Sequence, residues 1–211
     1  MNLIFDLDGT LVDSLPGIEA STRFSLSMFS PMKELPPMRS VIGPPIGKMF
    51  ARLWPDLTAA QLGELVARFR KHYDATGCRL SQLYPGVLDT LQKLKAREDN
   101  LFVLTNKPLR ASHVILDHLG VLSYFTELVS PDRREPAFLS KTDGARYLVD
   151  KYYLDKGSTV LVGDGLDDFA AADACGFVFI EAAYGYGGIS TAGPRSWPVA
   201  KTFPNILDSV L

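Results

Sequence analysis

The sequence has few of the residues that would tie it to several common classes of protein. Its two cysteines, Cys78 and Cys175, lie far apart and show no metal-ligand spacing, so we expect neither a disulfide framework nor a zinc site. We interpret both as small buried thiols, which fits a reducing, cytoplasmic setting. The three histidines fall in helical patterns without ligand spacing, and we assign them no role.

An excess of charge of one sign is also absent. The 22 Lys and Arg residues nearly balance the 24 Asp and Glu residues, so no basic footprint predicts nucleic acid as a partner. No basic amphipathic segment predicts a membrane surface, and no apolar run is long enough to span a bilayer. The first apolar run is cut by Asp6 and follows no basic region, so we do not expect a secretory signal.

Short apolar segments alternate with helical patterns over most of the chain. We predict strands at residues 3–7, 101–106, 126–130, 158–165 and 177–182. Between and after them, helical patterns cover residues 85–96, 108–119, 141–154 and 166–176. Such alternation implies a parallel sheet covered on both faces. We therefore predict an α/β protein with a doubly wound, Rossmann-like core.

Residues 15–84 interrupt this alternation. They contain helical patterns and Pro- and Gly-rich loops but no convincing strand. Thr58 and Gln61 form a possible capping box at the start of one of the helices. Because a strand precedes this segment, we interpret it as a small α-helical cap inserted after the first strand. Residues 1–14 and 85–211 would then form the catalytic core.

Polar side chains follow three of the predicted strands, at the point where each strand ends. They are Asp6 and Asp8, then Thr105 and Asn106, and then Asp164. Singly, each has an ordinary explanation as a turn residue or a helix start. Lys141, which opens a helix, is on its own better explained as a surface lysine. Their common location favours a functional site instead, because the carboxyl ends of parallel strands meet at one crevice.

The residue types in this crevice suit the handling of a phosphoryl group. Several carboxylates need a hard cation, and oxygen ligands suit Mg²⁺. A carboxylate, a metal ion, a lysine and a hydroxyl can together hold and stabilise a phosphoryl group during transfer. Asp6 can act as the nucleophile, since carboxylates form acyl phosphates. Asp8 can then protonate the leaving oxygen and later deprotonate water.

The motifs DLDGT, TN, a lysine and GDGLDD, in that order, resemble the haloacid dehalogenase-like hydrolase superfamily. The resemblance implies that Asp6 is the nucleophile and Asp8 the general acid and base. It implies that Asp6, the backbone carbonyl of Asp8, and Asp164 hold Mg²⁺. It further implies that Thr105 and Lys141 bind the phosphate with the help of the backbone amide of Asn106, and that Asp168 braces the waters of the metal. Asp167 is a competing candidate for that last role.

Within the superfamily, Asp8 favours a phosphate ester as substrate, or a phosphomutase. Residues 41–50, 84–91, 105–108 and 184–188 look most like the phosphoglycolate phosphatase-like branch. We therefore predict a Mg²⁺-dependent phosphatase that acts on a small phosphorylated metabolite.

The alternatives are a β-phosphoglucomutase-like phosphotransferase, a nucleoside-monophosphate phosphatase, and a degenerate member that only binds a ligand. In the cap, Arg23, Lys48 and Arg52 are candidates for contacting a substrate carboxylate or distal phosphate, and Gly43 for a close backbone approach. Solvated surface residues are the better explanation for each of the three cations, because Lys and Arg are mostly exposed.

Overall fold

The chain divides into two compact units. The structure, a computed structural model, describes residues 1–187, 189 and 196–210, so that Gly188, the last residue of the stretch 184–188, lies outside the described residues. One unit comprises Met1–Asp13 and Leu83–Leu211, and the other comprises Ser14–Gln82. These divisions fall close to the boundaries expected after residues 14 and 84. Two short strands, β2 (Val12–Asp13) and β3 (Gln82–Leu83), pair with each other in a separate two-stranded sheet.

The first unit is built on a six-stranded parallel sheet. Its strands are β1 (Asn2–Phe5), β4 (Asn100–Leu104), β5 (Glu127–Val129), β6 (Thr159–Gly163), β7 (Val178–Ala182) and β8 (Val199–Ala200). Their order in the sheet is β5-β4-β1-β6-β7-β8. Central β1 pairs with β4 on one side and with β6 on the other, and Phe5 lies opposite both Val103 and Val162. The five predicted strands are all present, which confirms the predicted fold class.

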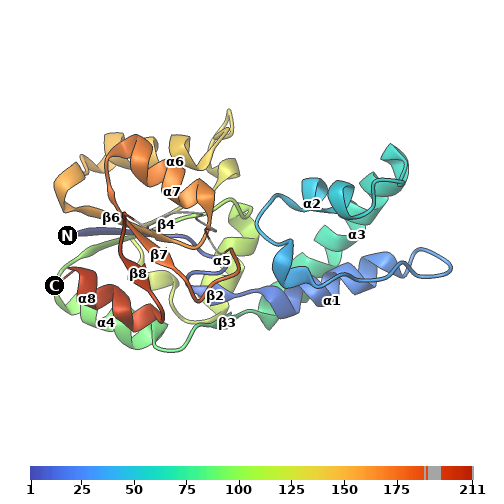
Figure 1. Cartoon of the computed structure of the whole chain (residues 1–211), viewed down its shortest axis with the longest axis horizontal. Helices are drawn as coiled ribbons and strands as arrows, with labels where there is room; N and C mark the ends of the chain where they lie inside the picture. Colours follow the sequence, from blue (N-terminus) through green and yellow to red (C-terminus); the bar gives the residue numbers. More distant parts are fainter. Residues whose placement is uncertain (188, 190–195, 211) are drawn as a thin grey trace. The chain divides into compact units, whose positions relative to one another are not determined.

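Helices cover both faces of this sheet (Figure 1). The helices α6 (Lys141–Tyr152) and α7 (Leu166–Cys175) lie on one face, and α4 (Val87–Ala96) and α8 (Ile206–Val210) lie on the other. The helix α5 (Leu109–His118) follows β4. Two elements near the C-terminus, β8 and α8, were not predicted, because each is too short to show a periodic pattern.

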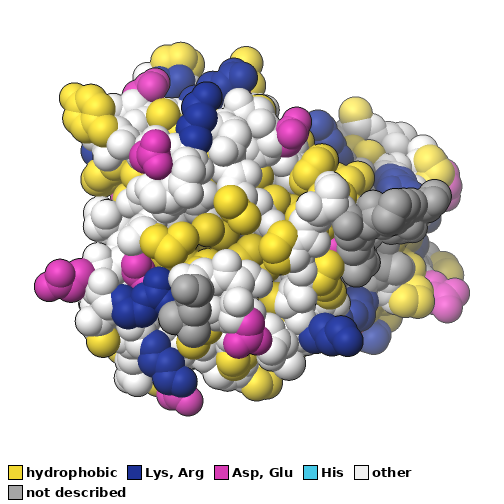
Figure 2. Space-filling view, turned by 60° about the vertical axis from the view of Figure 1, so that its left-hand side comes forward, with side chains coloured by type: hydrophobic (Ala, Val, Ile, Leu, Met, Phe, Trp, Pro, Cys, Tyr) yellow, Lys and Arg dark blue, Asp and Glu magenta, His cyan; other side chains and the backbone are white. Residues whose placement is uncertain are grey.

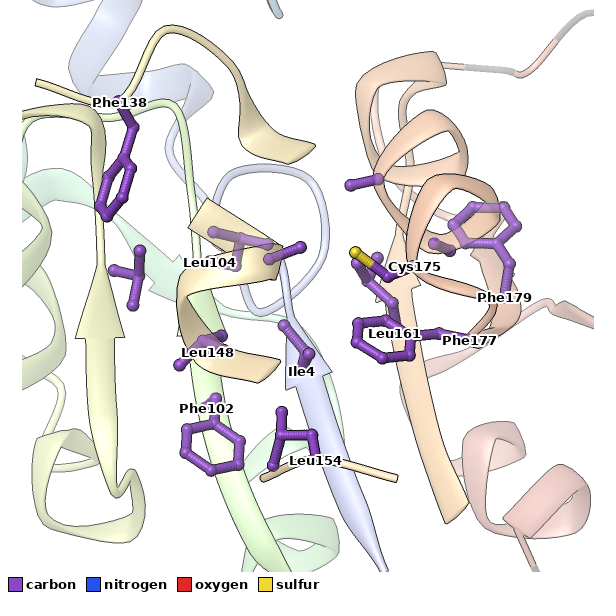
Figure 3. Close-up of a cluster of buried hydrophobic side chains, with 14 of the residues drawn as sticks. Ile4, Phe102, Leu104, Phe138, Leu148, Leu154, Leu161, Cys175, Phe177 and Phe179 are labelled. Carbon is purple, nitrogen blue, oxygen red and sulfur yellow. The ribbon is translucent and has the colours of Figure 1, made fainter. Parts of the chain in front are cut away.

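A cluster of apolar side chains fills the space between the sheet and the helices α6 and α7. Figure 3 shows Ile4, Phe102 and Leu161 of the strands facing Leu148 of α6 and Cys175 of α7, and all five side chains are at most 5% exposed. Cys78 is also buried and, like Cys175, is a free thiol. The prediction of two buried, unpaired thiols is therefore confirmed. This packing fixes the strands whose ends carry the polar residues.

Helix ends follow the local chemistry that the sequence indicates, with one exception. Ser140 caps α6 by accepting a hydrogen bond from the backbone N–H of Asp143 at 3.1 Å, and Gly176 ends α7 with a φ of 70°. In contrast, Pro85 does not open α4 as predicted. Gly86 adopts a left-handed conformation with a φ of 81°, so the helix begins at Val87, two residues after Pro85. Pro85 thus belongs to the turn before the helix.

The second unit is helical. It contains α1 (Leu15–Leu26), α2 (Ile46–Leu53) and α3 (Ala59–Ala75), and α3 packs against both of the others. The predicted capping box at the start of α3 is present, since Gln61 N–H donates to the Thr58 hydroxyl at 3.3 Å and Thr58 N–H donates to the Gln61 side chain at 3.0 Å.

The helical unit is basic. Ser14–Gln82 carries nine Lys and Arg and five Asp and Glu, a net charge of +4, whereas the rest of the chain carries −6. The three cations singled out in the sequence, Arg23 on α1 and Lys48 and Arg52 on α2, have exposed side chains. Their roles remain predictions.

The surface shows no single-signed footprint on the face drawn in Figure 2, where basic and acidic side chains are interspersed. None of the helices in the described part of the chain has both the length and the apolar character needed to cross a membrane.

Candidate active site

The sheet brings three predicted site residues to neighbouring strand ends. Asp6 follows β1, Thr105 follows β4 and Asp164 follows β6, and β1 lies between the other two strands. The backbone N–H of Asp6 still donates to Val162 of β6 at 2.9 Å, so the pairing continues to the first residue of the site. The topology therefore collects residues that lie far apart in the sequence.

Three carboxylates form a buried acidic cluster at this edge of the sheet. Oxygen atoms of Asp6, Asp164 and Asp168 lie within 4.8 Å of one another. Lys141, at the start of α6, donates to Oδ1 of Asp6 and to Oδ1 of Asp168, each at 2.6 Å. The Lys141 side chain is only 4% exposed. One lysine cation thus faces three carboxylates, a set of ligands that could hold a divalent cation.

Burial dominates the electrostatics of this cluster. It raises the pKa of Asp6 to about 7, although the ammonium of Lys141 opposes the rise. It also raises the pKa of Asp168, again against Lys141. For Lys141, burial lowers the pKa, but the carboxylates of Asp168 and Asp6 outweigh it and leave that pKa above its ordinary value. The lysine therefore stays charged while the carboxylates favour a further cation or a proton.

Asp164 is held by a loop that follows β7. Its Oδ2 accepts hydrogen bonds from the backbone N–H groups of Tyr186 at 2.8 Å and Gly187 at 3.1 Å. Burial, followed by the charge of Asp6, raises the pKa of Asp164 to about 6, and these two N–H groups limit the rise. They fix one oxygen of the carboxylate and leave the other for a ligand.

The loop after β1 approaches Asp164 closely. Gly9 has a φ of 87°, and a Cβ atom there would lie 2.1 Å from Oδ2 of Asp164. Gly185 is similarly constrained, since its Cβ would lie 2.3 Å from the carbonyl oxygen of Gly9. A side chain at either position would therefore displace the carboxylate or the backbone around it. In both cases the requirement for glycine is one of space, and at Gly9 it is also one of conformation.

Asp8 has a lysine partner of its own. Lys107 donates to both carboxylate oxygens of Asp8, at 3.0 and 2.9 Å. Among the described residues, the acidic cluster does not include the carboxylate of Asp8. The backbone N–H of Lys107 donates to the hydroxyl oxygen of Thr105 at 3.1 Å. The two aspartates of the DLDGT motif therefore each contact a different lysine.

The adjacent aspartates Asp167 and Asp168 have different surroundings. Asp168 is buried, and its Oδ2 accepts from the backbone N–H of Gly165 at 3.0 Å while Oδ1 contacts Lys141. Asp167 is exposed and accepts from the side chain of Asn106 at 3.1 Å. The structure thus places Asp168, and not Asp167, in the cluster. It also turns the Asn106 side chain toward Asp167, whereas the sequence assigned a role only to its backbone amide.

Two features of this site were not predicted. The sequence assigned no role to Lys107, because nothing near it in the sequence indicates which side chain it contacts. The backbone donors of Tyr186 and Gly187 are equally invisible to residue-type patterns, although the glycines around them are a weak sign of close backbone packing.

Comparisons with known proteins identify relatives of this chain. The family model for haloacid dehalogenase-like hydrolases matches residues 3–182. A phosphoglycolate phosphatase of Haemophilus influenzae is 33% identical over 193 residues, which cover 86% of this chain and 85% of the relative. A 5'-nucleotidase of Pseudomonas aeruginosa is 28% identical over 187 residues, which cover 88% of this chain and 84% of the relative.

The fold is shared as well. A solved structure of a haloacid dehalogenase-like family hydrolase from Streptococcus pneumoniae superposes with a TM-score of 0.87 at 24% identity, covering 100% of this chain and 98% of that one. The relatives confirm the resemblance to the phosphoglycolate phosphatase-like branch and the prediction of a phosphoric monoester hydrolase. Because one family model covers most of the sequence and the fold agrees with it, this chain belongs to the haloacid dehalogenase-like hydrolases.

Proposed function

We propose that the chain is a Mg²⁺-dependent phosphatase that hydrolyses a small phosphorylated metabolite through an aspartyl phosphate on Asp6. The observation that carries this proposal is the buried cluster of Asp6, Asp164 and Asp168 around Lys141. Carboxylates at the carboxyl ends of parallel strands, next to a buried lysine and a hydroxyl, can bind a phosphoryl group and its metal ion.

The donor set fits Mg²⁺, which prefers oxygen ligands and retains several waters. Asp6 and Asp164 would hold the ion together with the backbone carbonyl of Asp8. Both oxygens of Asp168 already accept hydrogen bonds, from Lys141 and Gly165, so this residue suits a bracing role better than direct ligation. When bound, the ion neutralises the carboxylates and the negative charge of the phosphoryl oxygens.

The proposed reaction has two steps. In the first, a carboxylate oxygen of Asp6 attacks phosphorus, the bond to the ester oxygen breaks, and Asp8 gives its proton to that oxygen. In the second, Asp8 takes a proton from water, the water oxygen bonds to phosphorus, and the bond to Asp6 breaks. Free phosphate and the original carboxylate result. Lys141, the Thr105 hydroxyl and the Asn106 amide would hold the phosphoryl oxygens during both steps.

A phosphoglycolate-like substrate is supported by the relative from Haemophilus influenzae. The 5'-nucleotidase from Pseudomonas aeruginosa supports a nucleoside monophosphate as the second candidate substrate.

A screen of the purified chain against phosphorylated metabolites, with Mg²⁺ and with EDTA, tests this function. We expect Mg²⁺-dependent release of phosphate, strongest with 2-phosphoglycolate, and loss of this activity in Asp6→Asn. The exposed Asp173→Asn is the matched control and should behave as the unaltered chain does.

Phosphate release by Asp6→Asn at the unaltered rate would refute the assignment of the nucleophile. Isomerised sugar phosphate in place of free phosphate would indicate the phosphomutase alternative.

A further inference from the structure

The roles proposed above for the phosphoryl-binding groups do not account for the contact between Lys107 and Asp8. The Lys107 ammonium lies 2.9 Å and 3.0 Å from the two oxygens of one carboxylate. Its side chain is 8% exposed, and that of Asp8 is 21% exposed. A lysine in this setting differs from a solvated surface lysine, because most of its side chain is removed from water.

The backbone of Lys107 is fixed on both sides. Its N–H donates to the Thr105 hydroxyl at 3.1 Å, and the Ser112 hydroxyl, which donates to the Pro108 carbonyl at 3.0 Å, also lies 3.4 Å from the carbonyl oxygen of Lys107. Pro108 follows directly, with its own φ restricted by the ring. The ammonium is thus carried by a rigid junction between β4 and α5. This rigidity suits a residue that must hold another side chain in place.

We propose that Lys107 is a positioning residue for Asp8. It holds the Asp8 carboxylate in one orientation. Its positive charge also stabilises the negative charge that Asp8 gains when it gives its proton to the leaving oxygen. This inference rests on the proposed function, and in particular on the acid role of Asp8. Lys141 contacts Asp6 and Asp168 in a similar way. One lysine therefore contacts the proposed nucleophile, and the other contacts the proposed general acid.

The proposal predicts that Lys107 matters only where the leaving oxygen needs a proton. When the ester bond of an alkyl phosphate such as 2-phosphoglycolate breaks, its alcohol portion leaves as a strongly basic alkoxide unless the leaving oxygen is protonated. p-Nitrophenyl phosphate releases a stable phenolate and does not need the proton. The quantity kcat/KM reports the steps up to departure of this group, so the later attack of water does not enter the comparison.

The test compares Lys107→Met with the unaltered chain on both substrates. We expect kcat/KM for 2-phosphoglycolate to fall by about 10- to 100-fold, which is part of the ~10²–10⁴-fold contribution of a general acid. For p-nitrophenyl phosphate the change should stay within about threefold. Asp8→Asn should show the same substrate dependence, and the double variant should be no slower than Asp8→Asn alone. Lys95→Met, which removes an exposed lysine, should change neither value.

Lys107→Arg keeps the charge and should recover part of the loss on 2-phosphoglycolate. It also provides a second variant if Lys107→Met does not fold, as judged by circular dichroism. Equal losses on the two substrates, a change in KM alone, or additive losses in the double variant would overturn the inference. A wild-type chain that hydrolyses neither substrate, or an Asp8→Asn variant without substrate dependence, would instead count against the proposed function.

Discussion

Replacing Asp164 by asparagine should stabilise the metal-free chain and remove its stabilisation by Mg²⁺. Burial raises the pKa of Asp164 from its ordinary 3.8 to about 6. The folded chain therefore holds this proton more tightly than the unfolded chain, so the free energy of unfolding falls as pH rises from about 4 to 6. By pH 8 the cost reaches about 3 kcal/mol, and at pH 5 it is about half of that.

The amide of Asp164→Asn avoids this cost without losing its partners. Its oxygen can still accept from the N–H groups of Tyr186 and Gly187. In EDTA at pH 8, we therefore expect this variant to be more stable than the unaltered chain by up to about 3 kcal/mol, or roughly 6–12 °C in melting temperature. The gain should shrink at pH 5.

Magnesium should reverse the ranking. At about 100 times its dissociation constant, Mg²⁺ should stabilise the unaltered chain by about 2.7 kcal/mol, whereas Asp164→Asn should gain almost nothing. Thermal unfolding at pH 5 and pH 8, in EDTA and in MgCl₂, measures all of these values, with Asp173→Asn as the control. An Asp164→Asn variant that is less stable than the unaltered chain in EDTA at pH 8, or that keeps its response to Mg²⁺, would show this reasoning to be wrong.

Two further predictions concern a loop and a buried carboxylate. Gly9→Ala should weaken Mg²⁺ binding by about 10- to 100-fold in calorimetric titration, because its Cβ would meet Asp164; Gly120→Ala, with a φ of 69° but open space around it, should bind normally, and equal effects would contradict the steric explanation. Burial acts to raise the pKa of Glu127, but hydrogen bonds, chiefly from Lys151, hold it below its ordinary 4.5. The stability that its charge provides is therefore present above pH 4.5 and lost as pH falls through the folded value. Glu127→Gln should cost about 1–3 kcal/mol in urea unfolding at pH 7, and this loss should shrink below pH 4.5; an equal loss at both pH values would refute the charge-based account.

The sequence predicts the sheet and most of the acidic cluster for one physical reason. Parallel strands end at a common edge, so Asp6 and Asp164 could be placed together without knowing the strand order. The capping residue Ser140 could likewise be found, because helix starts depend on side chains that accept a hydrogen bond from the backbone.

The features that escaped prediction depend on other information. Lys107 reaches Asp8 only because β4 lies beside β1, and nothing in its own neighbourhood in the sequence indicates that pairing. The hold on Asp164 comes from main-chain N–H groups, which nearly every residue possesses. The strand Val199–Ala200 is too short to produce an alternating pattern.

The central position of β1 has a consequence for synthesis of the chain. Asn2 pairs with Asn100 on one side and with Thr159 on the other, so β1 is synthesised long before either of the strands that flank it. Contacts between such distant segments form slowly, because a long stretch of chain must be closed first. A nascent chain that has not yet reached Asp168 lacks a member of the acidic cluster, so the cluster can form only after β6 and the start of α7 have been made.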